Sequence, residues 1–222
     1  MANMRVSRLW PSHTIAFEMS RSARRFAENR IKDAVADWNN HTKIELLEYP
    51  TEWLVRFPSS INPQRFKFAR TFYGIRAFST DAGWKNQGLQ YLYFLFPNVD
   101  DPTQNPDYNA NVGALVHEIG HVLGLWHEQQ RMDRDDHVIV NPFLMSDDEY
   151  KSNYAKKIPP WTLTHGAYDC NSVMHYPEIL PEFTINPNGN CTSGIGWLRR
   201  SDGTGGATWL SQGDIDAINN FY

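Results

Sequence analysis

The sequence predicts an α+β fold arranged in two lobes, and two features of its 222 residues support this prediction. In the first half, short runs of β-forming residues alternate with long segments of helical periodicity, which is typical of helices packed on a sheet. After residue 127 the chain is rich in Pro, Gly and Asn and irregular until a short helical pattern near its end. We therefore expect a sheet with two long helices in the first lobe, and an irregular second lobe that closes with a short helix.

The first lobe is predicted to begin with a strand followed by a long helix. Residues 14–19 alternate apolar and polar side chains, and Ser20 or Ser22 can cap a helix that runs to about Asn40. The apolar side chains of this helix recur at helical spacing, at Ala27, Ile31, Ala34, Val35 and Trp38. Further strands are expected in short β-type runs bounded by Pro, Gly, Asn and Ser, at residues 44–47, 53–57, 71–78 and 89–96. The helix should therefore lie against a sheet.

A second long helix is predicted over residues 112–126, after a loop dense in Pro, Asn and Asp. Near the end of the chain, Ser211 and Asp214 have the spacing of a helix cap before a short apolar helix. No internal repeat or clear linker interrupts the sequence. We therefore expect residues 1–222 to form a single domain, with lobes at 1–127 and 128–222 that meet at a cleft near the second helix.

Composition and charge exclude several classes of partner. The 21 basic and 25 acidic residues give a formal net charge of −4, which provides no broad positive surface for nucleic acid or an anionic membrane. No stretch of the sequence approaches the roughly 18 consecutive apolar residues needed to span a bilayer. We therefore expect no nucleic-acid partner and no transmembrane segment.

The two cysteines, Cys170 and Cys191, are too few for a disulfide scaffold. They could form one bridge that closes a loop of about twenty residues, remain free thiols, or bind a metal. The bridge is favoured, and the metal site is the least favoured, because cysteine metal sites usually include close Cys or His partners.

The chemistry of the sequence is concentrated in the pattern His117-Glu118-x-x-His121-x-x-Gly124-x-x-His127. On a helix, His117 and His121 project from the same face one turn apart, so both imidazoles can reach one metal ion. Glu118 points in a different direction, where its carboxylate can act as general base on a water at the metal. Gly124 can take a positive φ and end the helix, which lets His127 return as a third ligand.

Zinc is the expected cofactor, as a single catalytic ion. Three neutral imidazoles with one position left for water form a usual catalytic zinc site, and zinc lowers the pKa of its water to about 7. Glu118 would take a proton from this water as it attacks a peptide carbonyl, and would then hand it to the leaving amine. HExxH alone also occurs by chance on helices whose His and Glu face solvent, but the added glycine and third histidine make that alternative rare.

The run from His117 to Val138, HEIGHVLGLWHEQQRMDRDDHV, resembles the metzincin signature, and its RMDRD continuation resembles the astacin family of zinc metalloendopeptidases. Residues 172–176, SVMHY, are similar to the astacin Met-turn. The resemblance implies a two-lobed metzincin-like catalytic domain with a mixed twisted sheet, and a monomer that cuts proteins or peptides bound in an extended conformation. It also implies that Met174 is a hydrophobic base beneath the imidazoles. Tyr176 is implied as a further zinc ligand that swings away to stabilise the tetrahedral intermediate.

Two features depart from the family pattern. In mature astacins the Glu after the third His binds the α-amino group freed by propeptide removal, and Glu128 takes that place in a chain that starts at Met1. Either Met1 is not the native start, or Glu128 pairs internally with Arg131 or Arg134, which we favour. Animal astacin domains usually have four cysteines in two bridges, so the two cysteines here favour a microbial member.

Other features have less specific interpretations. Residues 88–94 could form an edge strand to which an extended peptide adds, or an ordinary interior strand. Arg199 and Arg200 could favour acidic substrate residues or form a surface charge pair. The remaining histidines fit no second metal cluster and are expected to be solvated or hydrogen-bonded: His13, His41, His137, His165 and His175.

Two other functions compete with that of an endopeptidase. A zinc-bearing domain that binds proteins without cutting them is disfavoured by the intact Glu118 and Tyr176. A different zinc hydrolase, such as an aminopeptidase, is disfavoured by the third histidine and the Met-turn. We expect a secreted, extracellular enzyme. Because residues 1–13 lack the apolar region of a secretory signal, either a leader has been removed or export follows another route, such as delivery into a host.

Overall fold

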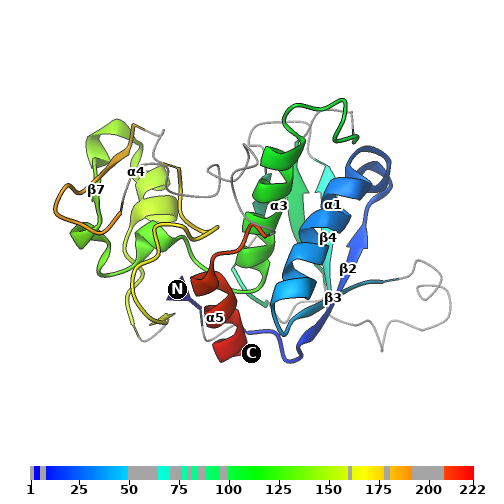
Figure 1. The fold of residues 1–222 in the computed structure, drawn as a ribbon, viewed down its shortest axis with the longest axis horizontal. Helices are drawn as coiled ribbons and strands as arrows, with labels where there is room; N and C mark the ends of the chain where they lie inside the picture. The colour runs from blue at the N-terminus through cyan, green and yellow to red at the C-terminus, as the bar shows by residue number, and fades with distance from the viewer. Residues whose placement is uncertain are drawn as a thin grey trace.

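The computed structural model describes residues 3–5, 9–49, 65–70, 77–79, 82–84, 89–95, 100–159, 162–177, 181–191 and 208–222. The strand predicted at residues 53–57, most of the strand predicted at 71–78, and Arg199 and Arg200 lie outside these residues. The described elements form two parts, a sheet covered by two long helices and a second part made of short elements (Figure 1).

A five-stranded sheet forms the first part, with the strand order β3-β2-β4-β6-β5. Its strands are β2 (Thr14–Met19), β3 (Glu45–Glu48), β4 (Arg65–Arg70), β5 (Ala77–Ser79) and β6 (Leu89–Phe94). The pairs β2–β3, β2–β4 and β4–β6 are parallel, whereas β5 runs antiparallel to β6. The expected mixed sheet is therefore confirmed.

The central strand β4 is absent from the sequence prediction, although its pattern is visible in the sequence. Phe66 and Phe68 are fully buried, and both rings pack against Phe17 of β2, with centroids 5.9 and 5.6 Å away. Between them, the Lys67 ammonium lies 2.9 Å from the carboxylate of Glu18 on β2. The strand thus alternates buried aromatic rings with charged side chains, as a strand with one covered face does.

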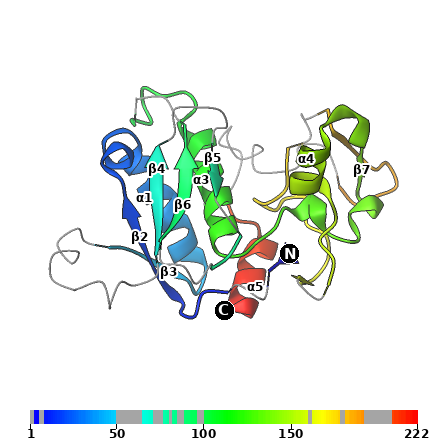
Figure 2. The same ribbon diagram turned by 180° about the vertical axis from the view of Figure 1, so that it is seen from behind.

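Two long helices, α1 (Arg21–His41) and α3 (Tyr108–Val122), lie side by side on one face of the sheet (Figures 1 and 2). Ser20 is the N-cap of α1, and its hydroxyl oxygen accepts a hydrogen bond from the Ala23 amide at 3.1 Å. The Trp38 indole of α1 donates to the carbonyl of Val116 in α3 at 3.1 Å. Both predicted helices are confirmed.

The boundaries of α3 differ from the predicted 112–126. The helix begins earlier, at Tyr108. The sequence prediction missed this start because the polar first turn carries no apolar periodicity. It also ends earlier, at Val122, because Gly124 adopts a φ of +104° and turns the chain. Leu125 lies beyond this turn and is nevertheless fully buried, which explains why the apolar pattern continues past the end of the helix.

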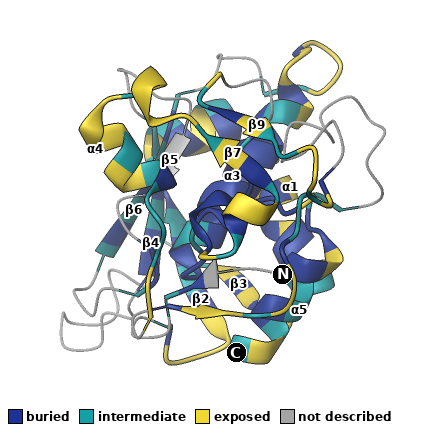
Figure 3. Cartoon of the chain, turned by 90° about the vertical axis from the view of Figure 1, so that its left-hand side faces the viewer, coloured by how far each residue is buried: buried dark blue, intermediate teal, exposed yellow. Residues whose placement is uncertain are grey.

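The second part consists of short elements. β7 (Val138–Val140) pairs antiparallel with β9 (Phe183–Ile185), α4 (Asp147–Glu149) continues into a π-helical turn, and β1 (Asn3–Met4) pairs with β8 (Leu163–Thr164). Single 3-10 turns lie at Glu128–Gln130, Arg134–Asp136 and Pro142–Leu144. This part has its own small apolar cluster, in which Val138 and Phe183 are buried. Figure 3 shows α4 largely exposed, whereas α3 is buried.

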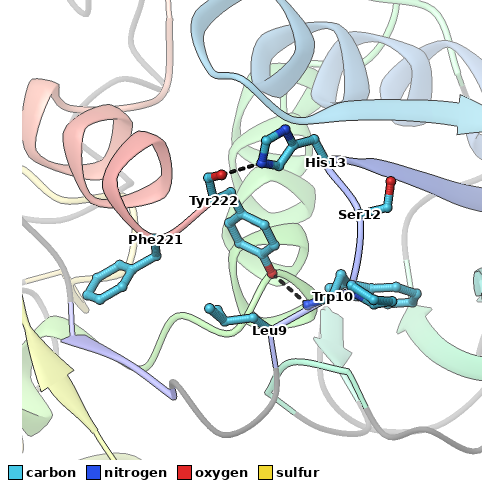
Figure 4. Close-up of a pocket in the computed structure, with 7 residues that line it drawn as sticks. Leu9, Trp10, Ser12, His13, Phe221 and Tyr222 are labelled. Carbon is cyan, nitrogen blue, oxygen red and sulfur yellow. Dashed lines mark hydrogen bonds between the residues drawn. The ribbon is translucent and has the colours of Figure 1, made fainter.

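The C-terminal helix α5 (Gln212–Phe221) joins the core of the first part, where Leu210, Ala217 and Ile218 belong to the same apolar cluster as Met174. Ser211 and Asp214 form the predicted cap at its start. At its other end, the Tyr222 hydroxyl accepts a hydrogen bond from the Trp10 amide at 3.2 Å, beside a shallow pocket (Figure 4). Among the described residues, no helix combines the length and apolar character needed to cross a membrane.

Candidate metal centre

The three histidines predicted as metal ligands come together at the end of α3. His117 and His121 lie on the helix, and His127 follows the turn after it. The nearest ring nitrogens of the three side chains lie within 4.8 Å of one another, and Nε2 of His121 is 3.0 Å from Nε2 of His127. In the part of the chain that the structure describes, this is the one group of three or more His, Cys, Asp or Glu side chains placed to share a metal ion.

His127 reaches the site because the chain turns sharply at Gly124. The positive φ of Gly124 is a conformation that other residues adopt only with strain. Backbone hydrogen bonds hold the turn on both sides: the Leu125 amide donates to the Gly120 carbonyl, and the Arg5 amide donates to the Gly124 carbonyl, each at 2.9 Å. The predicted role of Gly124 in ending the helix therefore agrees with the backbone geometry.

The outer ring nitrogens indicate the tautomers of two histidines. Nδ1 of His117 lies 2.7 Å from the Val173 carbonyl oxygen, and Nδ1 of His121 lies 2.8 Å from that of Leu125. Because a carbonyl oxygen can only accept, we infer that both Nδ1 atoms carry the proton and that each Nε2 presents a lone pair. This arrangement, with a backbone carbonyl orienting the outer nitrogen, is typical of histidines that bind metals.

The environment also keeps the three imidazoles neutral. Burial lowers the pKa of His117 to about 3 and the pKa of His121 to about 4. Burial likewise holds the pKa of His127 well below its usual value. Three neutral imidazoles whose lone pairs converge fit Zn²⁺, which favours nitrogen ligands and uses three protein ligands in catalytic sites.

Glu118 and Tyr176 lie beside the three histidines. Glu118 follows His117 on α3, and its side chain is largely buried. The Tyr176 ring centroid is 4.4 Å from that of His127 and 6.2 Å from that of His117. Burial raises the pKa of Tyr176 far above its usual value, and the negative charge of Glu118 raises it further. In the absence of a metal the phenol therefore stays protonated and can donate a hydrogen bond.

Met174 packs against the helix that carries two of the histidines. Its side chain is fully buried, and a Cβ atom at Gly120 of α3 would overlap its Sδ atom. The Met174 carbonyl accepts a hydrogen bond from the Glu128 amide at 3.1 Å. The turn at residues 172–176, which we call the Met-turn, is therefore held against both α3 and the segment that follows His127.

Glu128 pairs inside the protein with one of its two expected partners. Nη1 of Arg131 lies 3.3 Å from Oε1 of Glu128, and both side chains are buried. The Asp169 amide donates to the same oxygen at 2.8 Å. Burial raises the pKa of Glu128 to about 8, although the charge of Arg131 acts in the opposite direction. Arg134 donates instead to the Gln129 carbonyl at 3.0 Å.

Two residues next to the site, Tyr168 and Asp214, were not predicted as site residues from the sequence. The Tyr168 hydroxyl donates to Nε2 of His175 at 2.6 Å, and Nδ1 of His175 lies 2.7 Å from the Tyr176 carbonyl oxygen. Asp214, predicted only as part of a helix cap, binds Ser172 at a sequence separation of 42 residues. No local pattern signals a partner 42 residues away, so the spacing of Ser172 and Asp214 in the sequence gives no sign of their contact.

Two alternatives left open by the sequence are resolved by the structure. β6 lies between β4 and β5, so residues 89–94 form an interior strand and not the edge of the sheet. Cys170 and Cys191 form a disulfide, with their Cα atoms 5.5 Å apart. The bridge links the segment before the Met-turn to the segment that follows β9.

Comparisons with known protein sequences identify a protein family and related proteins. The family model described as Astacin, a peptidase family, matches residues 107–222. Bone morphogenetic protein 1 from Xenopus laevis is 27% identical over 231 residues, which cover 98% of this chain and 27% of that protein. Zinc metalloproteinase nas-29 from Caenorhabditis elegans is 46% identical over 77 residues, which cover 34% of this chain and 14% of that protein. The chain thus spans only a minor share of the length of these relatives.

Solved structures share the fold over nearly the whole chain. High choriolytic enzyme 1, a hatching enzyme zinc-protease from Oryzias latipes, matches with a TM-score of 0.65 at 22% identity, covering 96% of this chain and 93% of that one. Myroilysin matches with a TM-score of 0.61 at 19% identity, covering 99% and 98%. The matched family region contains the whole histidine pattern and the Met-turn. The chain therefore belongs to the astacin family of metalloendopeptidases, with His117, His121 and His127 as its zinc ligands.

Proposed function

We propose that residues 1–222 act as a single zinc-dependent endopeptidase domain, with lobes at 1–127 and 128–222, that hydrolyses internal peptide bonds of proteins. The observation that carries this proposal is the position of Tyr176 and Glu118 beside three converging histidines, two of them buried. A carboxylate and a protonated phenol next to a metal centre are the base and the hydrogen-bond donor that peptide hydrolysis needs.

Each residue has a defined task in this reaction. Zinc, when bound by the three histidines, supplies Lewis-acid activation of a water molecule. Glu118 accepts the proton of this water as its oxygen attacks the peptide carbonyl, and delivers the proton to the leaving amine as the C–N bond breaks. Tyr176, which the family resemblance makes a further zinc ligand, then donates its phenolic hydrogen bond to the oxyanion of the tetrahedral intermediate. The water oxygen ends in the new carboxyl group, and no covalent enzyme intermediate forms.

The proposed substrate is a polypeptide in an extended conformation. β5 is the last strand of the sheet, and no other described strand pairs with its outer edge. β5 also lies against α3, which carries His117 and Glu118. An extended peptide could add its backbone to this edge. We therefore propose that the substrate adds to β5, and not to residues 88–94 as the sequence had suggested.

We further propose that the enzyme is secreted and acts as a monomer. The Cys170–Cys191 disulfide supports secretion, because disulfides persist in oxidising, extracellular environments. Light scattering tests the monomeric state, because it measures the molar mass in solution. Secretion is tested by isolating the protein from the culture medium and asking whether it contains a disulfide that a reducing agent breaks.

The test compares the wild-type protein with a Glu118→Gln variant, in metal content by elemental analysis and in cleavage of denatured casein. Gln keeps the size of the side chain but cannot take up the proton, so we expect about one zinc per chain in both proteins and a loss of cleavage of at least about 100-fold. Asp148→Asn changes an exposed carboxylate of α4 and serves as the matched control that keeps wild-type cleavage.

The other outcomes separate the competing functions. Zinc without cleavage in the wild type would favour a binding domain, and a folded, metal-replete protein without zinc would overturn the proposal. Cleavage of peptides with blocked N-termini at internal bonds would exclude an aminopeptidase. An Asp148→Asn loss equal to that of Glu118→Gln would show that the loss reflects general damage and not the missing base.

A further inference from the structure

We propose that Asp214 is a positioning residue of the zinc site, because its buried carboxylate holds the Met-turn so that the Val173 carbonyl orients the imidazole of His117. This proposal rests on the zinc site described above. It assigns to the C-terminal helix a part in metal binding, although none of its residues is a ligand.

The carboxylate of Asp214 connects α5 to the Met-turn. Asp214 is fully buried, and its Oδ1 atom accepts a hydrogen bond from the Ser172 hydroxyl at 2.6 Å. Its Oδ2 atom accepts from the Val173 amide at 2.8 Å and from the Ser211 amide at 3.0 Å. The bond to Ser211 belongs to the helix cap, whereas the bonds to Ser172 and Val173 reach the Met-turn. The carboxylate thus has more partners than a helix cap requires.

Hydrogen bonds connect both peptide planes next to Val173 to Asp214, one directly and the other through Ser172. The amide of Val173 binds the carboxylate directly. The carbonyl of Val173 shares a rigid plane with the Met174 amide, and this amide donates to the Ser172 hydroxyl at 3.0 Å. The Ser172 hydroxyl in turn donates to Asp214. The direction of the Val173 carbonyl is therefore fixed from both sides.

That carbonyl is the acceptor for Nδ1 of His117 at 2.7 Å. His121 differs, because its acceptor is the carbonyl of Leu125, only four residues along the chain, in the turn at Gly124. The acceptor of His117 is 56 residues away and depends on the Met-turn. Loss of the Asp214 contacts should therefore disturb His117 specifically.

The test measures zinc affinity by competition with a chromophoric chelator. In Asp214→Asn the side chain keeps its volume but loses the charge that strengthens its hydrogen bonds. Its amide nitrogen only donates, so it either faces the Val173 amide and loses that bond, or faces Ser172 and forces the hydroxyl to accept instead of donate. Changes to the groups that orient metal ligands typically weaken metal binding 10–100-fold. Because Asp214 acts through one further residue, we expect a loss of about tenfold, at the low end of that range.

Two matched controls separate positioning from helix stability. Ser211→Ala removes the hydroxyl that accepts from the Asp214 amide and donates to the Asp169 carboxylate, and so weakens the cap of α5 while leaving both Asp214 bonds to the Met-turn. Asp216→Asn removes a carboxylate of the same helix that accepts a hydrogen bond from Gln212, one turn away within α5. Both controls should keep wild-type zinc affinity. In NMR spectra of the zinc-loaded protein, the Nδ1–H signal of His117 should move in Asp214→Asn and not in the controls.

Equal zinc affinities in Asp214→Asn and Ser211→Ala would overturn the proposal, and would leave the proposed function intact as long as the wild type binds zinc and cleaves casein. If Asp214→Asn does not fold, Ser172→Ala replaces it, because this change removes the hydroxyl that links the Met174 amide to the carboxylate. We then expect a loss of zinc affinity of a few-fold, and unchanged affinity in that variant would overturn the proposal.

Discussion

At the scale of single residues, three consecutive side chains of the Met-turn have different surroundings. Met174 packs on Gly120 of α3, whereas His175 turns toward the Tyr168 hydroxyl. Tyr176 turns back toward the ring of His127. The turn therefore supplies the site with an apolar base and a phenol, while the imidazole between them anchors the turn to the second part of the molecule.

Replacing Tyr176 with Phe should lower kcat by about 100-fold, because the variant lacks a donor to the oxyanion. Zinc content should stay near one per chain, since the three histidines remain, and KM should change less than kcat. Steady-state cleavage of a fluorogenic peptide measures both constants. Tyr154→Phe is the control, because Tyr154 packs edge-on against Tyr176, with ring centroids 5.7 Å apart. A Tyr176→Phe enzyme with wild-type kcat would show that the phenol has no part in the reaction.

Gly120→Ala should destabilise the protein by about 1–2 kcal/mol, because the new methyl group overlaps the buried Met174 side chain. Met174→Ala creates space at the same place, so the double variant should lose less stability than the sum of the two single changes. Urea unfolding of the four proteins in EDTA measures this coupling. Additive effects would contradict direct packing of Met174 on Gly120.

At the scale of elements, the ends of the helices place the reactive groups. α3 stops at Val122, and the positive φ of Gly124 lets His127 face the two histidines of the helix. The first turn of α5 contains Asp214, which reaches the Met-turn. Short elements of the second part, including the π-helical turn after α4, carry few buried side chains and depend on bonds to their neighbours.

Removal of the disulfide in a Cys170→Ala, Cys191→Ala double variant should cost about 3 kcal/mol of folding free energy, the loop-entropy value expected for a bridge across 21 residues. Urea unfolding of oxidised wild type and of the variant measures the difference. Reduced wild type is the control and should resemble the variant. If the double variant and the reduced wild type both unfold at the same urea concentration as the oxidised wild type, the loop is already held by its other contacts.

At the scale of the whole molecule, the zinc site lies where distant segments meet. The ligands come from α3 and the turn after it, the Met-turn supplies the acceptor for His117, and α5 fixes the Met-turn. The N-terminal strand β1 also pairs with β8 of the second part. Because these segments lie far apart in the sequence, metal binding should be coupled to folding of the entire chain.

Zinc should therefore raise the thermal midpoint of unfolding. A free zinc concentration of about 100 times Kd should add about 2.7 kcal/mol of stability, and EDTA should remove it. Differential scanning calorimetry with and without zinc measures the shift. His121→Ala should abolish the shift, whereas His41→Ala, at the end of α1, should retain it. A shift that persists in His121→Ala would place the stabilising zinc at a different site.

The sequence by itself determined the features that depend on neighbours a few residues apart. These are the spacing of the three histidines, the cap at Ser211, a first-helix cap at Ser20 or Ser22, and the turn at Gly124, because helix geometry and the conformational freedom of glycine act locally. The alternation in β4 was present but obscured by its charged residues, and the ends of α3 were displaced because apolar periodicity does not mark where a helix stops.

Only the tertiary structure decided that β6 lies inside the sheet, that Arg131 pairs with Glu128, and which carbonyl orients His117. The acceptor of His117 lies 56 residues along the chain, and the Asp214 bond to the Met-turn spans 41. Such contacts form when packing brings separate segments together, and each residue alone could have bound other partners. The metal ligands could therefore be predicted from the sequence, whereas the groups that orient them could not.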